Sequence, residues 1–500
     1  MDQHKNVERK EFHKRKEGYR AGNNGHRDFR KDNKREYKKD FSHKPGKFEH
    51  KNSTGFNKFR KTEEVEIKRL GINGEGIGYI NQKITFVRGA LPGEIVEIEI
   101  TKDEKNFKEG KLVNIKKPSE NRVPVCCEIQ NHCLNCPLMI LNDESIMYFK
   151  KDIIRDSLRK YTSIDFRRVE THNPILSDVR VDYVNEVHLP VVLFNDKPRV
   201  GIYQRDSKFL TVMDQCKLYH PIIRHILQSL EMIMEEDNIA VYNDDTRYGL
   251  RFVSIRVLEG SALVILVCGR NGMDPRFYEK VGKIENVDSV YYTVNTSKGQ
   301  NFASGRYMKA YGNTNQEVTF MSTKYILTPK TVFPENTSSA AKVVEAVREM
   351  LGEEGKEILE VNGGCGYLSH ALKEHHIKSI DYSKYNIQDA SYAAKANRLT
   401  HCDYEYGDVP ELMESICRNR SFDALIVHES KLGMNNHIKE NVVKSRTKEL
   451  IYISHSASSF AKDVGSLEKD YTLKTIVPID FKTYNEEIVI VARFVRNEKK

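Results

Sequence analysis

The sequence predicts a multidomain protein with a disordered basic N-terminal tail, a small β-barrel, an α+β central domain and a doubly wound α/β domain at the C-terminus. Three observations support this: a shift in composition near residue 62, a run of short strand-like segments after it, and a buried strand that enters a glycine turn in the last third of the chain. The predicted boundaries are 1–62, 63–118, 119–325 and 326–500. With 500 residues, of which 39% are hydrophobic, the chain is long enough for several cores.

The composition also bounds the location of the protein. No stretch reaches the length of apolar sequence that a transmembrane helix needs, and the first residues are polar and charged rather than apolar. We therefore expect no membrane partner, no secretion and a cytoplasmic location. Nine cysteines do not suggest a disulfide framework, because nine is an odd number, so closely spaced cysteines are better explained as ligands of a metal or cluster.

Residues 1–62 form a strongly basic segment. They hold 20 of the 80 lysines and arginines but only 9 of the 71 aspartates and glutamates. The segment has no isoleucine or leucine and a single valine, Val7, so it cannot bury enough apolar surface to offset chain entropy, and we predict it to be disordered. Aromatic side chains are interspersed with the basic ones, a mix that suits phosphates and unpaired bases. Contact with RNA is predicted, and a solubilising arm is the alternative.

Short strand-like segments follow the tail. Val96, Ile98 and Ile100 alternate with polar neighbours, which is the period-two pattern of a half-buried strand. Glycines and the Pro92-Gly93 pair separate the segments as turns. Short strands with such turns predict a small closed β-barrel of the oligonucleotide-binding type.

This stretch also resembles a known module. The pattern L-x-x-x-G-E-G at residues 70–76, followed by F-V-x-G-A-L-P-G-E at residues 86–94, is similar to the TRAM module of RNA-modifying enzymes. The resemblance implies that the barrel holds structured RNA. A barrel with a purely structural role is the alternative.

A cluster of cysteines comes next. Cys127, Cys133 and Cys136 are spaced C-x5-C-x2-C, so three thiolates can converge on one metal centre from a single loop. Cys216 is the candidate for the fourth ligand. Four thiolates suit zinc or a [4Fe-4S] cluster, and buried free thiols are a third possibility. Cys126 competes with Cys127 for the first ligand position, and the spacing favours Cys127.

The segment from about 137 to 325 alternates strand-like and helical stretches. It is predicted to be an α+β domain built around the cysteines. Arg251 and Arg256 lie in one of its strand-like runs, where they are candidates either for RNA contact or for a salt bridge at the edge of the core.

The C-terminal segment carries the pattern of a nucleotide-binding fold. A buried strand, 358–361, enters the turn Gly363-Gly364-Cys365-Gly366, and the next strand ends in Asp381. A glycine turn lets the backbone approach a ligand closely, and a carboxylate at the end of the second strand can accept hydrogen bonds from ribose hydroxyls. An alanine-rich helix, a strand followed by Asp408, and another buried strand come after it. These residues alone predict a domain that binds a dinucleotide or S-adenosylmethionine (AdoMet).

The whole arrangement resembles the RNA uracil-5 methyltransferases, AdoMet-dependent enzymes that form 5-methyluridine in tRNA and rRNA. The barrel, the C-x5-C-x2-C run, a later cysteine, G-L-R-x-x-x-I-R at 249–256 and the glycine turn follow one another as in that family, from residue 63 to about 495. The resemblance implies structured RNA, either rRNA or tRNA, as the partner, with no DNA expected. It implies a [4Fe-4S] cluster rather than zinc, and AdoMet held by Glu360, Gly364, Gly366, Asp381 and Asp408.

The residues expected to perform catalysis depart from the family pattern. Methylation of uracil C5 needs a thiolate that adds to C6 and a general base that removes the C5 proton. The family's cysteine follows a strand, and here the corresponding stretch from Tyr452 to Asp463 places His455 at the position of the nucleophile. The expected H-x-E-x-V pattern is replaced by residues 485–489, in which Glu487 keeps the position of the general base.

Two further segments differ from the family. The tetrapeptide D-P-P-R is replaced by residues 428–431, His-Glu-Ser-Lys, and Pro334 stands where a glutamine would contact the cofactor. The segments for the nucleophile, base positioning and cofactor contact have therefore all changed, whereas the glycine turn and the cysteines are retained. We expect an RNA-binding member of the family that is impaired in 5-methyluridine formation. An active methyltransferase with altered catalytic residues is the alternative.

Overall fold

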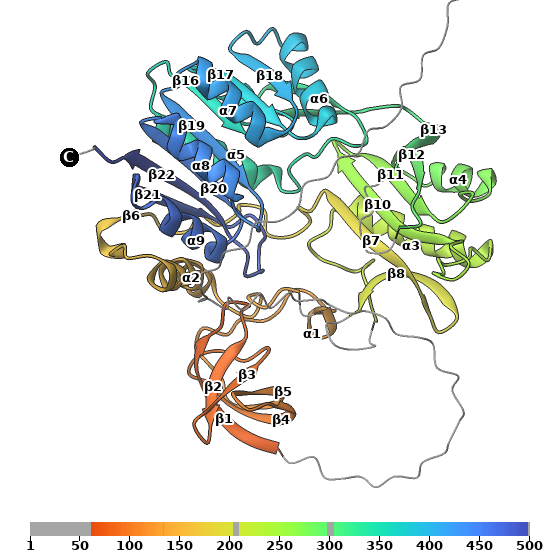
Figure 1. Ribbon diagram of the computed structural model, residues 1–500. Coiled ribbons are helices and arrows are strands. Elements are labelled where there is room, and N and C mark those ends of the chain that lie inside the picture. Colours follow the sequence, from red (N-terminus) through yellow and green to blue (C-terminus); the bar gives the residue numbers. More distant parts are fainter. Residues whose placement is uncertain (1–61, 134, 204–209, 298–304, 499–500) are drawn as a thin grey trace, which may run out of the picture. The chain divides into compact units, whose positions relative to one another are not determined.

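The computed structural model describes residues 62–133, 135–203, 210–297 and 305–498 (Figure 1). The predicted disordered tail at 1–62 lies outside the described residues except for Thr62, which begins the first strand. Within the described ranges, no helix is both long and apolar enough to cross a bilayer.

The first described unit of structure is a closed five-stranded barrel, as the alternating pattern predicts (Figure 1). Its strands, in the barrel order β1-β2-β3-β5-β4, are β1 (Thr62–Leu70), β2 (Gly76–Ile80), β3 (Lys83–Val87), β5 (Phe107–Lys117) and β4 (Ile95–Asp103). Apolar residues at every second position, such as Val65 and Ile67 of β1, fill the interior.

Two glycines of β2, the last one of the G-E-G pattern and Gly78, are required by close packing. A Cβ atom on Gly76 would lie 2.7 Å from the carbonyl oxygen of Ala90, and one on Gly78 would lie 2.5 Å from that of Glu66. Both distances are far below van der Waals contact with backbone atoms that cannot rotate away. The barrel therefore closes only with glycine at these two positions.

The central domain is built on a seven-stranded sheet with helices packed against it. The strand order is β13 (Met308–Gly312), β12 (Val287–Val294), β11 (Ser261–Cys268), β10 (Leu250–Leu258), β7 (Glu186–Phe194), β8 (Lys197–Tyr203) and β9 (Leu210–Val212). Helices α3 (Pro221–Glu236) and α4 (Pro275–Gly282) bury apolar faces in the same core as β10 and β11. The short helix α1 (Gln130–Cys133) lies in the cysteine segment.

The two arginines of β10 are buried and donate hydrogen bonds to oxygens of the protein. Arg256 is buried, and its guanidinium donates to Gln316 Oε1 at 2.7 Å and to the carbonyls of Thr331 and Thr328 at 2.6 and 3.1 Å. Arg251 donates to backbone carbonyls at 3.0 Å. The sequence predicted either contact with RNA or a salt bridge for these arginines; the structure shows hydrogen bonds to uncharged oxygens of the protein, and contact with RNA stays a prediction. Their partners are carbonyl and amide oxygens brought in from other segments, which sequence patterns do not identify.

The C-terminal sheet has eight strands and is doubly wound, as predicted. Its order is β18 (Cys402–Tyr406), β17 (His376–Asp381), β16 (Glu357–Val361), β19 (Ala424–Glu429), β20 (Glu449–Ser454), β22 (Val489–Arg496), β21 (Tyr471–Ile479) and β6 (Glu170–Thr171). The strands β18, β17, β16, β19 and β20 run parallel, and β22 is antiparallel to both of its neighbours.

Helices cover both faces of this sheet. In β16, Leu359 and Val361 pack on one face, and Ile358 packs on the other. The first face carries α7 (Val409–Asn419), α8 (Asn436–Ser445) and α9 (Ala457–Leu467). The second face carries α5 (Thr337–Leu351), α6 (Lys384–Ala396) and the hairpin of β14 (Gln316–Phe320) and β15 (Thr323–Leu327). The hairpin spans the predicted boundary at residue 325, so that boundary does not coincide with a change of core.

The C-terminal core also includes a segment from before the central domain. Helix α2 (Asp143–Tyr161) places Ile154 and Leu158 in the same apolar cluster as α9 (Figure 1). After a 3-10 turn at Phe166–Arg168, β6 pairs in parallel with β21. The structure therefore differs from the predicted span 119–325, because an amphipathic helix pattern does not reveal which core the helix joins.

Candidate functional site

Four parallel strands of the C-terminal sheet end at one edge, and the predicted cofactor and catalytic residues lie at these ends. Glu360 is the penultimate residue of β16, and Asp381 is the last residue of β17. His428 and Glu429 are the last two residues of β19, and His455 directly follows β20. The carboxyl edge of an open parallel sheet is where such folds bind ligands. The structure therefore brings together residues that are up to 95 positions apart in the sequence.

The glycine turn leaves an open surface at this edge. A Cβ on Gly363 would lie 2.0 Å from Ser379 Oγ and 2.5 Å from Glu360 Oε2, so no side chain fits there. Gly364 adopts φ +62°, and nothing lies within 4 Å of the place where its Cβ would be. Gly366, at φ +78°, is packed against Tyr404. The turn thus requires glycine for packing at two positions and offers space for a ligand at the third.

Asp381 is held in place beside this open surface. Its Oδ2 accepts a hydrogen bond from the Gly364 amide at 3.0 Å, and its Oδ1 accepts from the Ser383 amide at 2.7 Å and from Asn386 Nδ2 at 3.3 Å. A carboxylate oxygen has two acceptor sites, so Oδ2 retains one for an incoming hydroxyl. The residues around Gly364 therefore fit a ribose-bearing cofactor.

The other two predicted cofactor residues have different surroundings. Glu360 is fully buried, with Oε1 at 3.2 Å from His428 Nε2, and Oε2 has no hydrogen-bond partner among the described residues. An unpaired buried acceptor is costly, which suits a site that a donor group occupies. Asp408 is the N-cap of α7, where its Oδ1 accepts from the Glu411 amide at 3.1 Å. This capping role is the ordinary structural one for an aspartate at such a position.

Glu429 is a site residue that the sequence analysis missed. Burial raises the pKa of its carboxyl to about 7, and the charge of Asp463 adds to this effect, whereas a hydrogen bond from Asn362 and the charge of Lys439 oppose it. A group with a pKa near 7 can both accept and donate a proton at neutral pH. The only sequence signal for it is its place in the tetrapeptide 428–431.

His455 directly follows β20, with its ring centroid 6.0 Å from that of Phe481. The residue is exposed at the surface, but desolvation by the surrounding protein lowers the pKa of the imidazole to about 4. The nearby His428, Lys482 and Lys431 also lower this pKa, and only Glu487 opposes them. The residue at the nucleophile position is therefore a neutral imidazole at physiological pH.

Glu487 faces the same edge from the loop between β21 and β22. Its carboxylate forms an ion pair with Lys431 and lies 3.6 Å from Lys482 Nζ. The loop is anchored by the buried Lys150 of α2, whose Nζ donates to Asp480 Oδ1 at 2.5 Å and to the Glu487 carbonyl at 2.7 Å. The general-base position is thus fixed by a lysine whose partners lie more than 300 residues away in the sequence.

The structure describes all nine cysteines, and none presents an exposed thiol at this edge. Cys365 is in the glycine turn, but its side chain is buried in the core, which raises the pKa of the thiol to about 12. Cys402 begins β18 at the opposite edge of the sheet, and Cys417 lies on α7 against the core. None of these three thiols therefore takes the place of the nucleophilic cysteine expected at position 455.

The predicted metal ligands lie within electrostatic reach of one another. Burial raises the pKa of Cys216 to about 11, and Cys133 and Cys127 add to this effect. Burial likewise raises the pKa of Cys136, with contributions from the other three thiols. Within the ranges that the structure describes, however, no three His, Cys, Asp or Glu side chains are close enough to hold a metal ion. The metal site stays a prediction.

Comparison with known proteins gives three findings. A family model of the TRAM domain matches residues 58–113. An uncharacterized RNA methyltransferase of Halalkalibacterium halodurans is 26% identical over 439 residues, which covers 85% of this chain and 94% of that protein. One of Bacillus cereus is 27% identical over 450 residues, covering 87% and 97% of the two chains.

The fold has a counterpart among solved structures. The tRNA (uracil-54, C5)-methyltransferase of Pyrococcus abyssi, in complex with S-adenosyl-L-homocysteine, superposes with a TM-score of 0.67 at 22% identity. The match covers 87% of this chain and 100% of that one, so it includes the barrel, the central domain and the C-terminal sheet. The solved structure shows the fold of this chain, and its sequence is similar to a TRAM domain and, over most of its length, to RNA methyltransferases.

Proposed function

We propose that this protein binds AdoMet and a tRNA or rRNA, and that it is impaired in forming 5-methyluridine. The observation that supports the impairment is the neutral imidazole of His455 at the position where the reaction needs a thiolate. The RNA is supported by the TRAM domain and by the similarity to the P. abyssi enzyme, which is a tRNA (uracil-54, C5)-methyltransferase.

The missing step is the activation of the pyrimidine. AdoMet supplies the methyl group when bound, but C5 of uracil attacks it only after a nucleophile has added to C6. A thiolate adds and later leaves readily, whereas a neutral imidazole is a weaker nucleophile of different shape. Glu487 is oriented by Lys431 and Lys482 and is available to take the C5 proton, but without addition at C6 there is no adduct for it to resolve.

The alternative proposal is an active methyltransferase with different chemistry. Glu429, with a pKa of about 7, and the Glu360–His428 pair offer proton acceptors at the same edge. Transfer to a nitrogen needs a lone pair on that nitrogen and a base for its proton, but no thiolate. Mapping methylated nucleotides in RNA from cells with and without the gene separates the two proposals. Loss of a methyl mark in cells that lack the gene would establish the active enzyme and refute the impaired one.

AdoMet binding is tested at Gly364. We expect Gly364→Ala to weaken AdoMet binding at least tenfold in calorimetry, because the new methyl group would occupy the open space beside Asp381. The matched control is Gly352→Ala at the C-terminus of α5, where φ is +75° and again nothing lies within 4 Å. This variant also places a methyl group at a positive φ, so it should lower stability but leave AdoMet binding unchanged. Equal affinity in both variants would argue against this site.

We further propose a [4Fe-4S] cluster on Cys127, Cys133, Cys136 and Cys216, with zinc as the alternative metal. Burial and the neighbouring thiols raise the pKa of Cys133, Cys136 and Cys216, and a bound metal would stabilise their thiolates instead. We expect Cys216→Ser to lose the metal in anaerobically purified protein, measured as iron and zinc content. Cys126→Ser, which alters the exposed neighbour, should keep it. Metal retained in the first variant would exclude this ligand set.

A further inference from the structure

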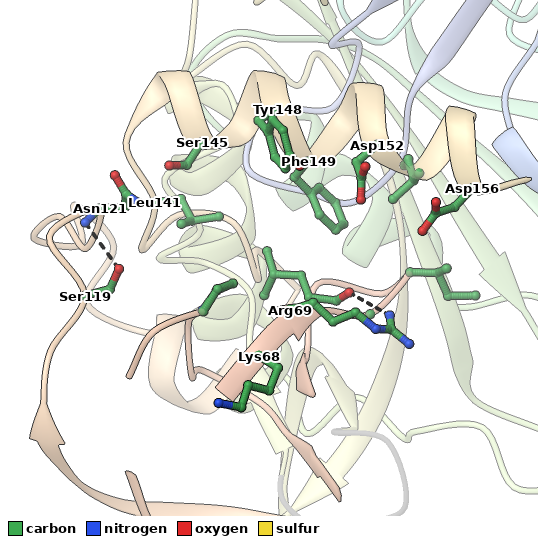
Figure 2. Close-up of a pocket in the computed structure, with 15 residues that line it drawn as sticks. Lys68, Arg69, Ser119, Asn121, Leu141, Ser145, Tyr148, Phe149, Asp152 and Asp156 are labelled. Atoms are coloured by element: carbon green, nitrogen blue, oxygen red, sulfur yellow. Dashed lines mark hydrogen bonds between the residues drawn. The ribbon is translucent and has the colours of Figure 1, made fainter. Parts of the chain in front are cut away.

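A cavity of about 240 Å³ lies between the barrel and helix α2, away from the carboxyl edge described above. One wall is the end of β1 with the residues after it, and the other wall is a single face of α2 (Figure 2). We call it the barrel–helix cleft, and the residues that matter for its chemistry are Lys68, Arg69, Tyr148, Phe149, Asp152 and Asp156.

The cleft is preformed, because its floor is a packed apolar cluster. Leu91 of the barrel, Leu141 and Phe149 are buried together, and Leu70 and Ile153 pack against them. Beside this cluster, Arg122 holds the barrel through two hydrogen bonds to the buried Glu94, at 2.6 and 2.8 Å. Both walls are therefore fixed before any ligand enters.

The two walls carry opposite charges that do not neutralise each other. Figure 2 shows Asp152 and Asp156 projecting from α2 toward the end of β1, where Arg69 lies. The Arg69 guanidinium donates to the Leu70 carbonyl at 3.2 Å. Asp152 accepts from Arg155, and Asp156 lies 3.5 Å from Arg159, both on their own helix. Among the residues that the structure describes, no ion pair joins the two walls.

An exposed aromatic ring completes the α2 wall. Tyr148 is four residues before Asp152 on the same face of the helix, and 66% of its surface is exposed. A ring so exposed contributes little to folding and is available to stack on a flat ligand. The cleft thus offers an apolar floor, a stacking ring, carboxylate acceptors and a guanidinium.

These features match one nucleotide better than the others. Guanine presents two adjacent donors, N1–H and the N2 amino group, which pair with the two oxygens of one carboxylate. Adenine and cytosine present one amino donor beside an acceptor nitrogen, and this nitrogen would repel the second oxygen of a carboxylate. Uracil has a single N–H donor with a carbonyl on each side, so its carbonyl oxygens would also repel a carboxylate. The exposed guanidinium of Arg69 is a suitable partner for the phosphate of such a nucleotide.

We propose that the barrel–helix cleft binds a single guanine nucleotide of the RNA, extruded from its strand, at a site separate from the methyl-transfer site. This inference rests on the proposed RNA binding and adds a sequence preference to it. The guanine stacks on Tyr148, its Watson–Crick edge pairs with Asp152 or Asp156, and its phosphate contacts Arg69. Shape and unpaired bases are the usual basis of such recognition in single-stranded RNA.

The test is binding of fluorescent ten-nucleotide uridine oligomers that carry one central guanine, adenine, cytosine or inosine, measured with the full chain at physiological salt. We expect the guanine oligomer to bind about tenfold more tightly than the all-uridine oligomer, which is the discrimination that one bidentate pair provides. Inosine lacks the N2 amino group, so its oligomer should fall between the two.

Variants of the cleft residues test whether the guanine preference arises in the barrel–helix cleft. The double variant Asp152→Asn with Asp156→Asn should abolish the guanine preference, and so should Tyr148→Ala. The control Glu144→Gln removes a carboxylate of α2 outside the cleft and should preserve the preference. Arg69→Gln should weaken guanine binding more than Arg88→Gln, which removes the same charge from an exposed barrel position. A guanine preference that survives in the cleft variants, or no preference in the parent protein, would overturn the proposal.

The outcome is distinguishable from failure of the proposed function. AdoMet binding is measured on the same variants, and a protein that prefers guanine but binds no AdoMet would refute the cofactor proposal alone. Competition by free GMP, with inorganic phosphate as its control, separates a free nucleotide from an RNA base. If free GMP competes with the labelled oligomer as strongly as an unlabelled guanine oligomer does, the cleft is a site for a free nucleotide and not an RNA subsite.

Discussion

Replacing His455 with cysteine is expected to give this protein a covalent adduct with RNA that contains 5-fluorouridine, where the parent protein gives none. With AdoMet present, a thiolate at this position would add to C6 of the fluorinated base and C5 would take the methyl group; the fluorine that stays on C5 cannot be removed as a proton, so the adduct persists. Lys431 and Lys482, which help to keep His455 uncharged, would favour the thiolate. The adduct is measured as a protein band of reduced mobility in denaturing gels.

His428→Cys is the matched control for that experiment. It also replaces an imidazole at the same edge with a thiol, but at the end of β19 and not after β20. We expect no adduct from this variant. An adduct formed by the parent protein would show that His455 does not block the reaction, and an adduct from His428→Cys alone would place the target base elsewhere.

The largest effect on stability is expected for Lys150→Met. Lys150 and Asp480 form an ion pair in which both side chains have no solvent exposure. Burial lowers the pKa of Lys150 and raises that of Asp480, so each charge depends on the other. Removing the lysine leaves a buried carboxylate without its cation, which costs about 3–5 kcal/mol. The measurement is the midpoint of urea unfolding followed by circular dichroism.

Lys151→Met is the control for this prediction. Lys151 is the next residue of α2, and it donates to the Thr171 carbonyl at 3.3 Å and to Asn173 at 3.0 Å near the surface. Its loss should cost less than about 1 kcal/mol. The double variant Lys150→Met with Asp480→Leu should be more stable than Lys150→Met alone, since no charge is then buried unpaired. Equal midpoints for the two single lysine variants would contradict the predicted role of the pair.

The parts of the fold that follow from local sequence were predictable. The barrel follows from alternating apolar residues and from glycines that the packing of β2 requires, and the glycine turn follows from a buried strand before it and Asp381 after the next strand. In each case the residues that produce the structure are neighbours in the chain, so a short pattern contains the information.

The remaining features depend on residues that are far apart in sequence. The raised pKa of Glu429 results from burial beneath other elements and from Asp463, and the buried Arg256 is satisfied by oxygens from the β14–β15 region. The amphipathic pattern of α2 does not reveal which core the helix joins. Such features follow from the tertiary arrangement, which a single sequence does not display.

The position of α2 has a consequence for how the protein is made. On the ribosome, Lys150 is synthesised 330 residues before Asp480, so translation continues for tens of seconds before its partner exists. During that time the apolar side of the helix, with Ile154 and Leu158, has no native surface to cover it. Residues 326–500 alone would lack α2, so we expect this fragment to expose the apolar side chains of α9 that Ile154 and Leu158 cover in the whole chain.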